Sequence, residues 1–172
     1  MTIVTRRTLL VPYSESLQSD FLMLNCCAKN RAEMNGPHTV ASAKQLFQRI
    51  LNDPSIYAMA VLDIQTREYM GHVFISEIDS APELGYLFDK TYWGKGLGTE
   101  AVKAFFSRAC WELNLETVKA TANTHHTASL SILNKLGFVL VGEHEDTFGP
   151  FFEFVFTSDV EAGENCQLEN HT

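Results

Sequence analysis

The sequence predicts one α/β domain built on a single mixed, mostly antiparallel β-sheet of about seven strands, with about four helices. Apolar residues alternate with polar ones in several short segments, which is the spacing of half-buried strands. In longer stretches they recur every three or four positions, as in amphipathic helices. A strand at 83–88, a glycine-rich loop, a helix and a strand at 117–122 follow in the order of a β-α-β crossover. The two strands of this crossover are therefore expected to run parallel.

The first half of the chain reads as a strand, two helices and an antiparallel strand pair. A short strand at 7–11 ends at a proline, and apolar positions then recur at helical spacing over 17–28. A second helix is expected over 42–51, because the Asn-Asp-Pro that follows disfavours helical backbone. Alternating segments at 56–64 and 69–78 flank a polar turn, which predicts an antiparallel pair.

The second half supplies two more helices and two final strands. The helix after the glycine loop carries apolar residues on one face and is expected to end near Asn114. Another helix is expected from about Ala128 to Gly137, since glycine readily adopts the left-handed backbone that ends helices. The last two strands are expected at 138–144 and 151–157, around a Gly-Pro turn.

Length and composition limit the class of protein. A chain of 172 residues with 45% hydrophobic residues can bury one full core, which we expect over residues 1–158. The last stretch, 159–172, is polar and is expected to be a frayed tail. No run is long enough for a membrane span or resembles a secretory signal, so we expect no membrane association.

Charge and cysteine content narrow the partners and the compartment. A formal charge of −8 argues against nonspecific binding to nucleic acid and favours a cationic acceptor. The four cysteines lack the spacing of zinc ligands and the density of a disulfide framework, so a cytoplasmic location is expected. The adjacent His125 and His126 have no third ligand nearby, so no metal site is expected.

Three alternating glycines, Gly94, Gly96 and Gly98, precede the helix of the crossover and suggest an anion site. Glycines allow the backbone to approach a bulky anion, and the first N–H groups of a helix have no helical acceptor. The segment is not a nucleotide-hydrolase phosphate loop, because Thr-Glu and not Lys-Ser or Lys-Thr follows Gly98. It also lacks the glycine that a dinucleotide fingerprint would place two residues after Gly98, where this chain has Glu100. A flexible surface turn is the alternative interpretation.

Further motifs extend the comparison to a known family. The segments are Trp-Gly-Lys-Gly-Leu-Gly-Thr-Glu-Ala at 93–101, Ala-Ser-Leu-Ser-Ile-Leu-Asn-Lys-Leu-Gly-Phe at 128–138 and Asn-Gly-Pro-His-Thr at 35–39. Together they resemble the GNAT acetyltransferase superfamily, in its RimJ/RimL-type branch, over most of residues 8–157. The resemblance implies the GNAT fold with a cofactor-binding crossover and acetyl-CoA as co-substrate. It also implies direct attack by a primary amine without a covalent enzyme intermediate.

The resemblance also implies which residues hold coenzyme A. Main-chain groups of the glycine loop would bind its diphosphate, with the Lys95 side chain either adding charge or lying in solvent. Exposed main-chain groups of Leu87 and Phe88 would bind the pantetheine amides as an added strand would. His126 stands where the branch usually has asparagine and would donate the same hydrogen bond, or relay a proton. The residues of the loop are Trp93, Gly94, Lys95, Gly96, Leu97, Gly98 and Thr99.

Candidates for proton transfer follow from the same resemblance. Many superfamily members place a tyrosine acid four residues after the Ser129 position, but this chain has Leu133 there. Ser129 lies one turn earlier on the same helix face, so its hydroxyl could serve as the acid, or simply cap the helix. Glu83, at the start of the central strand, is the first candidate for the base that deprotonates the amine. A solvent-facing glutamate is the alternative. The competing bases are Glu143, His144 and Glu145.

Two functions remain open. The first is an acetyl-CoA-dependent N-acetyltransferase whose acceptor is a protein N-terminus or a small-molecule amine. The second is a non-catalytic module that binds or senses acyl-CoA, which the departures at Leu133 and His126 allow. The residues name neither the acceptor nor the oligomeric state, so monomer and homodimer both stay open.

Overall fold

One eight-stranded sheet organises the part of the chain that the structure describes. The computed structural model describes residues 1–158, so the expected tail at 159–172 lies outside the described residues. The strands lie in the order β1-β2-β3-β4-β5-β6-β8-β7. They are β1 (Ile3–Val4), β2 (Thr8–Pro12), β3 (Tyr57–Asp63), β4 (Tyr69–Ser76), β5 (Glu83–Phe88), β6 (Thr117–Asn123), β7 (Val139–Asp146) and β8 (Gly149–Thr157).

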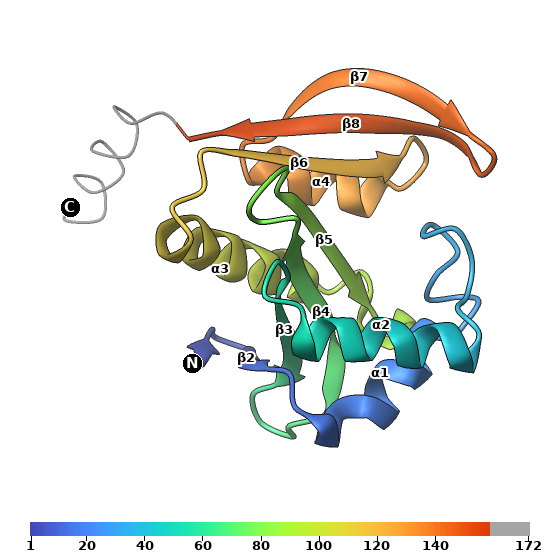
Figure 1. The fold of residues 1–172 in the computed structure, drawn as a ribbon, viewed down its shortest axis with the longest axis vertical. Coiled ribbons are helices and arrows are strands. Elements are labelled where there is room, and N and C mark those ends of the chain that lie inside the picture. Colours follow the sequence, from blue (N-terminus) through green and yellow to red (C-terminus); the bar gives the residue numbers. More distant parts are fainter. Residues whose placement is uncertain (159–172) are drawn as a thin grey trace.

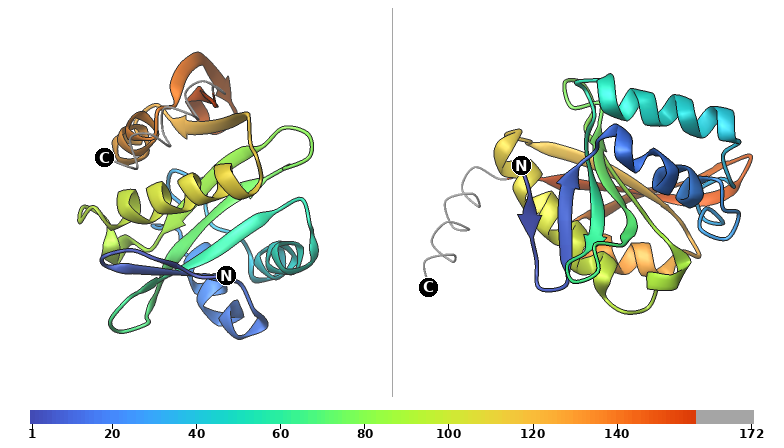
Figure 2. Two further views of the ribbon diagram at one scale, coloured as in Figure 1. Left: turned by 90° about the vertical axis from the view of Figure 1, so that its left-hand side faces the viewer. Right: turned by 90° about the horizontal axis from the view of Figure 1, so that it is seen from below.

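Helices cover both faces of this sheet. Figure 2 shows α1 and α2 against one face and α3 against the other. The helices are α1 (Gln18–Asn25), preceded by a 3-10 turn η1 (Glu15–Leu17), α2 (Val40–Asn52), α3 (Leu97–Glu112), preceded by η2 (Lys90–Tyr92), and α4 (Thr127–Lys135). Asn114 and Gly137 follow α3 and α4 with positive φ of 51° and 91°, the left-handed backbone that ends helices.

The predicted fold class is confirmed, with one strand more than expected. The central strand predicted at 83–88 is β5, and its parallel pairing with β6 confirms the predicted crossover. The other paired strands are antiparallel. The strand that the sequence missed is β1, in which Ile3 pairs with Leu10 of β2. Two residues are too few to show an alternating pattern.

The sheet is split between its two parallel strands. Glu83 and Lys119 form the one register pair between β5 and β6, and the Lys119 N–H donates to Pro82 O at 2.8 Å. Along its full length β6 pairs with β8, and after Lys119 it has no register pair with β5. Figure 1 shows β5 and β6 diverging across the molecule. The split leaves one edge of β5 open in the middle of the sheet.

Apolar side chains fill the space between the sheet and α3. Val73 and Ile75 of β4 are fully buried, as are Val102 and Phe105 of α3. Burying one such side chain stabilises the fold by about 1.5 to 3 kcal/mol. This packing fixes α3, and with it the glycine loop at its start, relative to β5.

A buried polar group lies on the opposite face, beneath α1 and α2. The His72 ring of β4 contacts the Phe21 ring, and its Nδ1 lies 3.1 Å from the Tyr13 hydroxyl. The Tyr13 hydroxyl also bonds the hydroxyl of Tyr69. Burial, aided by the charge of Arg31, lowers the pKa of His72 to about 3.

We expect this histidine to destabilise the protein in acid. A histidine in the unfolded chain titrates near 6.5, so between that value and 3 the unfolded chain binds one more proton than the folded chain. The free energy of unfolding should therefore fall by about 1.4 kcal/mol per pH unit between roughly pH 5.5 and 4 through this group alone. Denaturant titrations of the wild type and His72→Gln measure it. The two pH slopes should differ by that amount, and equal slopes would contradict the prediction.

Candidate active site

The glycine loop turns sharply before α3. Gly94 and Gly96 both have φ of +76°, a left-handed backbone that residues with a β-carbon rarely adopt. Gly98 lies inside the helix, where an added β-carbon would lie 3.4 Å from the Phe88 ring of β5. The first two glycines are therefore favoured by backbone conformation, whereas at Gly98 a β-carbon would just contact the Phe88 ring and a larger side chain would need further space.

The start of α3 presents donors without acceptors. Gly96 occupies the N-cap position and has no side chain to cap the helix. The first helical hydrogen bond runs from Glu100 N–H to Gly96 O at 3.2 Å, so the N–H groups of Leu97, Gly98 and Thr99 have no helical acceptor. Together with the positive end of the helix dipole, these groups form a site suited to a phosphate.

The main-chain groups of β5 alternate between its two neighbours. Asp89 N–H, just after the strand, donates to Met70 O on the β4 side at 2.8 Å. Pro82 O, just before the strand, accepts from Lys119 on the β6 side. Because these groups alternate along a strand, odd-numbered residues direct theirs to β4 and even-numbered residues to β6.

Tyr86 and Phe88 are therefore the residues whose main-chain groups lie on the open edge. Leu87 is in register with His72 and directs its main-chain groups to β4. Tyr86, and not the predicted Leu87, is therefore the residue that accompanies Phe88 at the open edge. Trp93, whose side chain is 47% exposed, donates from Nε1 to Phe88 O at 2.9 Å. The Tyr86 groups and the Phe88 N–H face the gap between β5 and β6.

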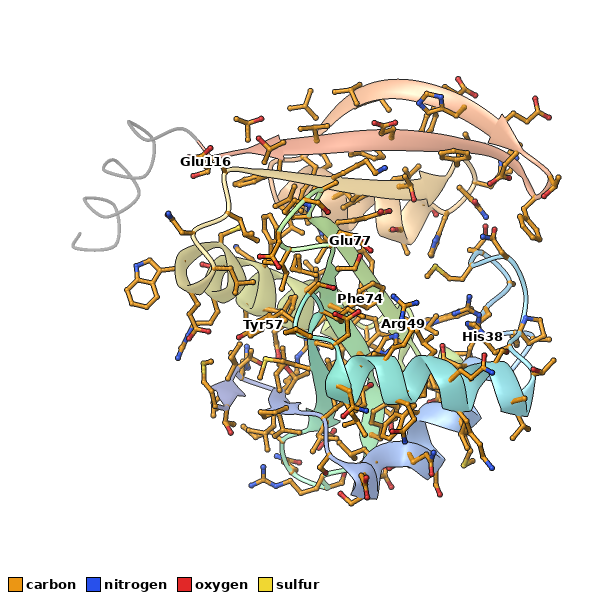
Figure 3. The ribbon with its side chains drawn as sticks, in the orientation of Figure 1. His38, Arg49, Tyr57, Phe74, Glu77 and Glu116 are labelled. Carbon is orange, nitrogen blue, oxygen red and sulfur yellow. The ribbon has the colours of Figure 1, made fainter. Side chains whose placement is uncertain are left out.

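A cavity of about 400 Å³ lies at this gap and reaches the face covered by α1 and α2. It brings together four groups from three elements: Glu83 and Tyr86 of β5, His126 before α4, and Ser129 of α4. Phe74 of β4 also lines it, and in Figure 3 this side chain lies between α2 and the strands β6 and β8. The predicted proton-transfer residues Glu83 and Ser129 therefore share one cavity.

Two hydroxyl groups meet in this cavity. The Tyr86 hydroxyl lies 2.8 Å from Ser129 Oγ and 3.3 Å from the Ser129 carbonyl oxygen. Burial raises the pKa of Tyr86 to about 12, against the opposing effect of its hydrogen bond with Ser129. Ser129 is the third residue of α4 and the N-cap is His126, so Ser129 does not cap this helix. No local pattern in β5 marks Tyr86 as a site residue.

The competing bases lie elsewhere. Glu143, His144 and Glu145 are exposed on β7, and none of them is among the described residues that line the cavity. His144 pairs through Nε2 with Oε2 of Glu153 at 3.0 Å. Of these four candidate bases, Glu83 is therefore the one that lines the cavity.

His126 lies at the cavity wall and is half-buried. Burial lowers its pKa, and the charge of Glu33 opposes that effect. Glu33 comes from the connection between α1 and α2, and it accepts from Asn123 Nδ2 through both its Oε2 and its carbonyl oxygen, each at 3.1 Å. A neutral His126 ring can donate one hydrogen bond and accept another. No local sequence pattern marks Glu33 or Asn123, which lie 90 residues apart in the chain.

A second tether holds the same connection to the other side of the gap. The buried Asn30 donates from Nδ2 to Asp89 Oδ2 at 3.1 Å and accepts from the Lys90 N–H at 2.9 Å. Glu33 binds the end of β6, whereas Asn30 binds the chain just after β5. The connection therefore spans the divergent ends of the two strands and closes one side of the cavity.

A sequence model described as an acetyltransferase (GNAT) domain matches residues 7–139, which include β5, the glycine loop, α3 and α4. The chain belongs to the GNAT acetyltransferase family. The sequence-based assignment to this family is thereby confirmed.

Curated relatives cover this GNAT chain only in part. The uncharacterized N-acetyltransferase p20 of Bacillus licheniformis is 31% identical over 106 residues, which are 58% of this chain and 59% of that protein. The probable N-acetyltransferase YjcK of Bacillus subtilis (strain 168) is 38% identical over 55 residues, 32% of this chain and 30% of that protein. The matches thus span less than two thirds of either relative.

Solved structures share the fold over nearly the whole chain. Ribosomal-protein-S5-alanine acetyltransferase from Vibrio fischeri matches with a TM-score of 0.79 at 20% identity, covering 93% of this chain and 98% of its own. Spermidine N-acetyltransferase from Vibrio cholerae, solved with CoA and spermine, matches with a TM-score of 0.79 at 14% identity, covering 89% and 96%. At such identities the likeness shows the GNAT fold alone.

Residues 1–158 contain no group of three or more histidine, cysteine, aspartate or glutamate side chains placed to hold a metal ion. No helix in the same range combines the length and the apolar character that crossing a bilayer would demand.

Proposed function

We propose that the protein is an acetyl-CoA-dependent N-acetyltransferase that transfers an acetyl group to a primary amine. The observation that carries the proposal is the pair of sites joined by the open edge of β5: an uncapped helix start at one end and a cavity with Glu83, Tyr86 and Ser129 at the other. Coenzyme A has matching parts, because its diphosphate suits the helix start and its pantetheine amides suit a strand edge. The thioester would then lie in the cavity.

The reaction we propose is a direct acyl transfer. The free amine attacks the thioester carbonyl carbon, the C–N bond forms, and the C–S bond breaks to release CoA thiolate. Glu83 takes the proton lost by the amine, directly or through water. The thiolate gains a proton at the paired hydroxyls of Tyr86 and Ser129, and no covalent enzyme intermediate forms.

The acceptor we propose is cationic before it reacts. The carboxylates of Glu33, Glu83 and Asp146 line the cavity. They outnumber the cations of Arg31 and Lys119 that also line it, and this excess favours a protonated amine on approach. Both a peptide N-terminus and a small amine meet this requirement. Relatives in fold named for ribosomal-protein acetylation and for spermidine acetylation support the same range, and the RimJ/RimL-type branch is our proposal within the family.

Compartment and domain limits complete the proposal. We propose one GNAT domain over residues 1–158, and a cytoplasmic location in keeping with the free thiols of Cys26, Cys27 and Cys110.

The deciding experiment separates a transferase from a binding module. Isothermal calorimetry with CoA measures binding, and release of free thiol from acetyl-CoA in the presence of a panel of small amines and short peptides measures transfer. We expect binding together with amine-dependent thiol release. Binding without release for any amine would favour the alternative, a module that senses acyl-CoA. Absence of CoA binding would contradict both.

The hydroxyl pair provides a mutational prediction. Tyr86→Phe removes the hydroxyl but keeps the ring, and Ser129→Ala removes its partner. Each change should lower kcat by about tenfold or more, because a positioned acid contributes up to several orders of magnitude to a proton transfer. Since the two hydroxyls act as one unit, the double variant should lose little more than either single variant. Independent, multiplying losses would contradict a shared role. Steady-state kinetics with acetyl-CoA decides between them.

A further inference from the structure

A salt bridge lies beside the glycine loop and belongs to none of the groups above. Arg7, in the turn between β1 and β2, pairs with Glu100 in the first turn of α3, with Nε 3.0 Å from Oε1. The Arg7 Nη1 donates to the Lys95 carbonyl oxygen at 3.0 Å. A β-carbon added at Gly96 would lie 3.5 Å from Nη2 of the same guanidinium. One side chain thus contacts both ends of the loop, before and after its turn.

Glu100 collects more donors than an ordinary surface glutamate. Besides the Arg7 Nε, its carboxylate accepts from the Arg7 main-chain N–H at 2.9 Å and from the Thr5 hydroxyl at 2.7 Å. Partial burial acts to raise the pKa of Glu100, but the hydrogen bonds from Thr5 and Arg7 outweigh it, so the pKa is lowered. The carboxylate is therefore charged and held in place.

The position of this charge matters for an anion site. Glu100 lies in the first helical turn, directly after Leu97, Gly98 and Thr99, whose N–H groups lack helical acceptors. A negative charge so close would repel a diphosphate, because two like charges a few ångströms apart disfavour each other. Arg7 supplies the compensating positive charge. It also fixes the carbonyl of Lys95, which precedes the left-handed Gly96.

We propose that Arg7 is a positioning residue of the phosphate loop. Acting through Lys95 and Glu100, it holds the loop in the shape that exposes the helix N–H groups and cancels the charge that would repel the diphosphate. The inference rests on the proposed function, since it concerns how this protein binds coenzyme A. Cofactor affinity would then depend on the turn between β1 and β2, which lies more than ninety residues before Glu100 in the chain.

Calorimetry with CoA, together with steady-state kinetics, tests the inference. Arg7→Met removes the guanidinium and keeps much of the apolar stem; it should weaken CoA binding by about tenfold and raise the KM for acetyl-CoA similarly. The KM for the amine and kcat should change much less. Arg7→Lys keeps the charge but cannot serve both partners at once, so its affinity should lie between those of Arg7→Met and the wild type.

Two further variants separate a role at the loop from a general loss of stability. In Arg7→Met/Glu100→Gln the uncompensated charge is gone, so part of the affinity lost in Arg7→Met should return. The control is Arg108→Met. It breaks the salt bridge at the other end of α3, in which Arg108 Nε lies 2.7 Å from Glu112 Oε1. It should leave CoA affinity within about twofold of the wild type, as expected for an exposed helix pair far from the site.

The outcomes are distinct. If the wild type binds CoA and Arg7→Met binds it with the same affinity, this inference is overturned and the proposed function stands. An equal loss in Arg108→Met, or a fall in kcat and a rise in both KM values alongside a lowered melting temperature, shows a merely structural role and also overturns it. A wild-type chain that binds no CoA overturns the proposed function and this inference together.

Discussion

Replacing Glu83 with glutamine should lower kcat by about a hundredfold to ten thousandfold, the range that a positioned general base contributes. Glutamine preserves the size of the side chain and its hydrogen-bonding capacity but cannot accept the amine proton. The KM for acetyl-CoA should change little, because the groups proposed to hold the cofactor lie on the main chain of Tyr86, Phe88 and the glycine loop. Steady-state kinetics over a range of amine concentrations provides the measurement.

The pH dependence of this variant distinguishes a base from a packing residue. Without Glu83, only amine that is already deprotonated in solution can attack, so kcat/KM should rise about tenfold per pH unit below the amine pKa. Glu143→Gln, a matched change on exposed β7, should behave as the wild type does. A Glu83→Gln enzyme with normal turnover and an unaltered pH profile would eliminate the assignment.

Substituting valine at both Gly96 and Gly98 should weaken CoA binding by at least about a hundredfold, equivalent to about 2.7 kcal/mol. Valine resists the left-handed backbone that Gly96 adopts, at a cost of about 1 to 3 kcal/mol, so the loop must change shape. At Gly98 the added β-carbon would lie 3.4 Å from Phe88, and the methyl groups need further space. Calorimetry with CoA measures the loss.

The control for this change carries similar strain elsewhere. Gly149, the first residue of β8 after the turn from β7, has φ of +113° with no atom within 4 Å of an added β-carbon. Gly149→Val should therefore incur a backbone penalty while preserving CoA affinity within about twofold. Full affinity in the Gly96/Gly98 variant would show that the diphosphate binds elsewhere.

The parts of the fold that depend on local chemistry were predictable. Glycine is favoured where φ is positive, so the spacing of Gly94 and Gly96 located the loop and the start of α3. The alternation in β5 set its limits at Glu83 and Phe88, and Gly137 marked the end of α4. Each of these features is decided by a few neighbouring residues.

The parts of the fold and of the site that depend on contacts between distant residues were not predictable from the sequence. The spacing of Glu83 and Tyr86 puts their side chains on opposite sides of β5, but it could not reveal that α4 brings Ser129 to the Tyr86 hydroxyl. The pairing of Arg7 with Glu100 joins residues 93 positions apart, and no local pattern marks it. The register of β5 against β4 is equally absent from any local pattern, so the sequence could not show that the main-chain groups of Leu87 face β4 and those of Tyr86 face the open edge.

The divergence of β5 and β6 has a consequence for the abundance of the protein. A sheet with a vacant place in its middle is completed by whatever ligand supplies the missing strand, so on the proposed function the folded state gains free energy from its own co-substrate. At a free CoA concentration a hundredfold above the Kd, this linkage adds about 2.7 kcal/mol to the free energy of unfolding. Resistance to proteolysis would then follow the metabolic supply of coenzyme A, even when no acceptor amine is present.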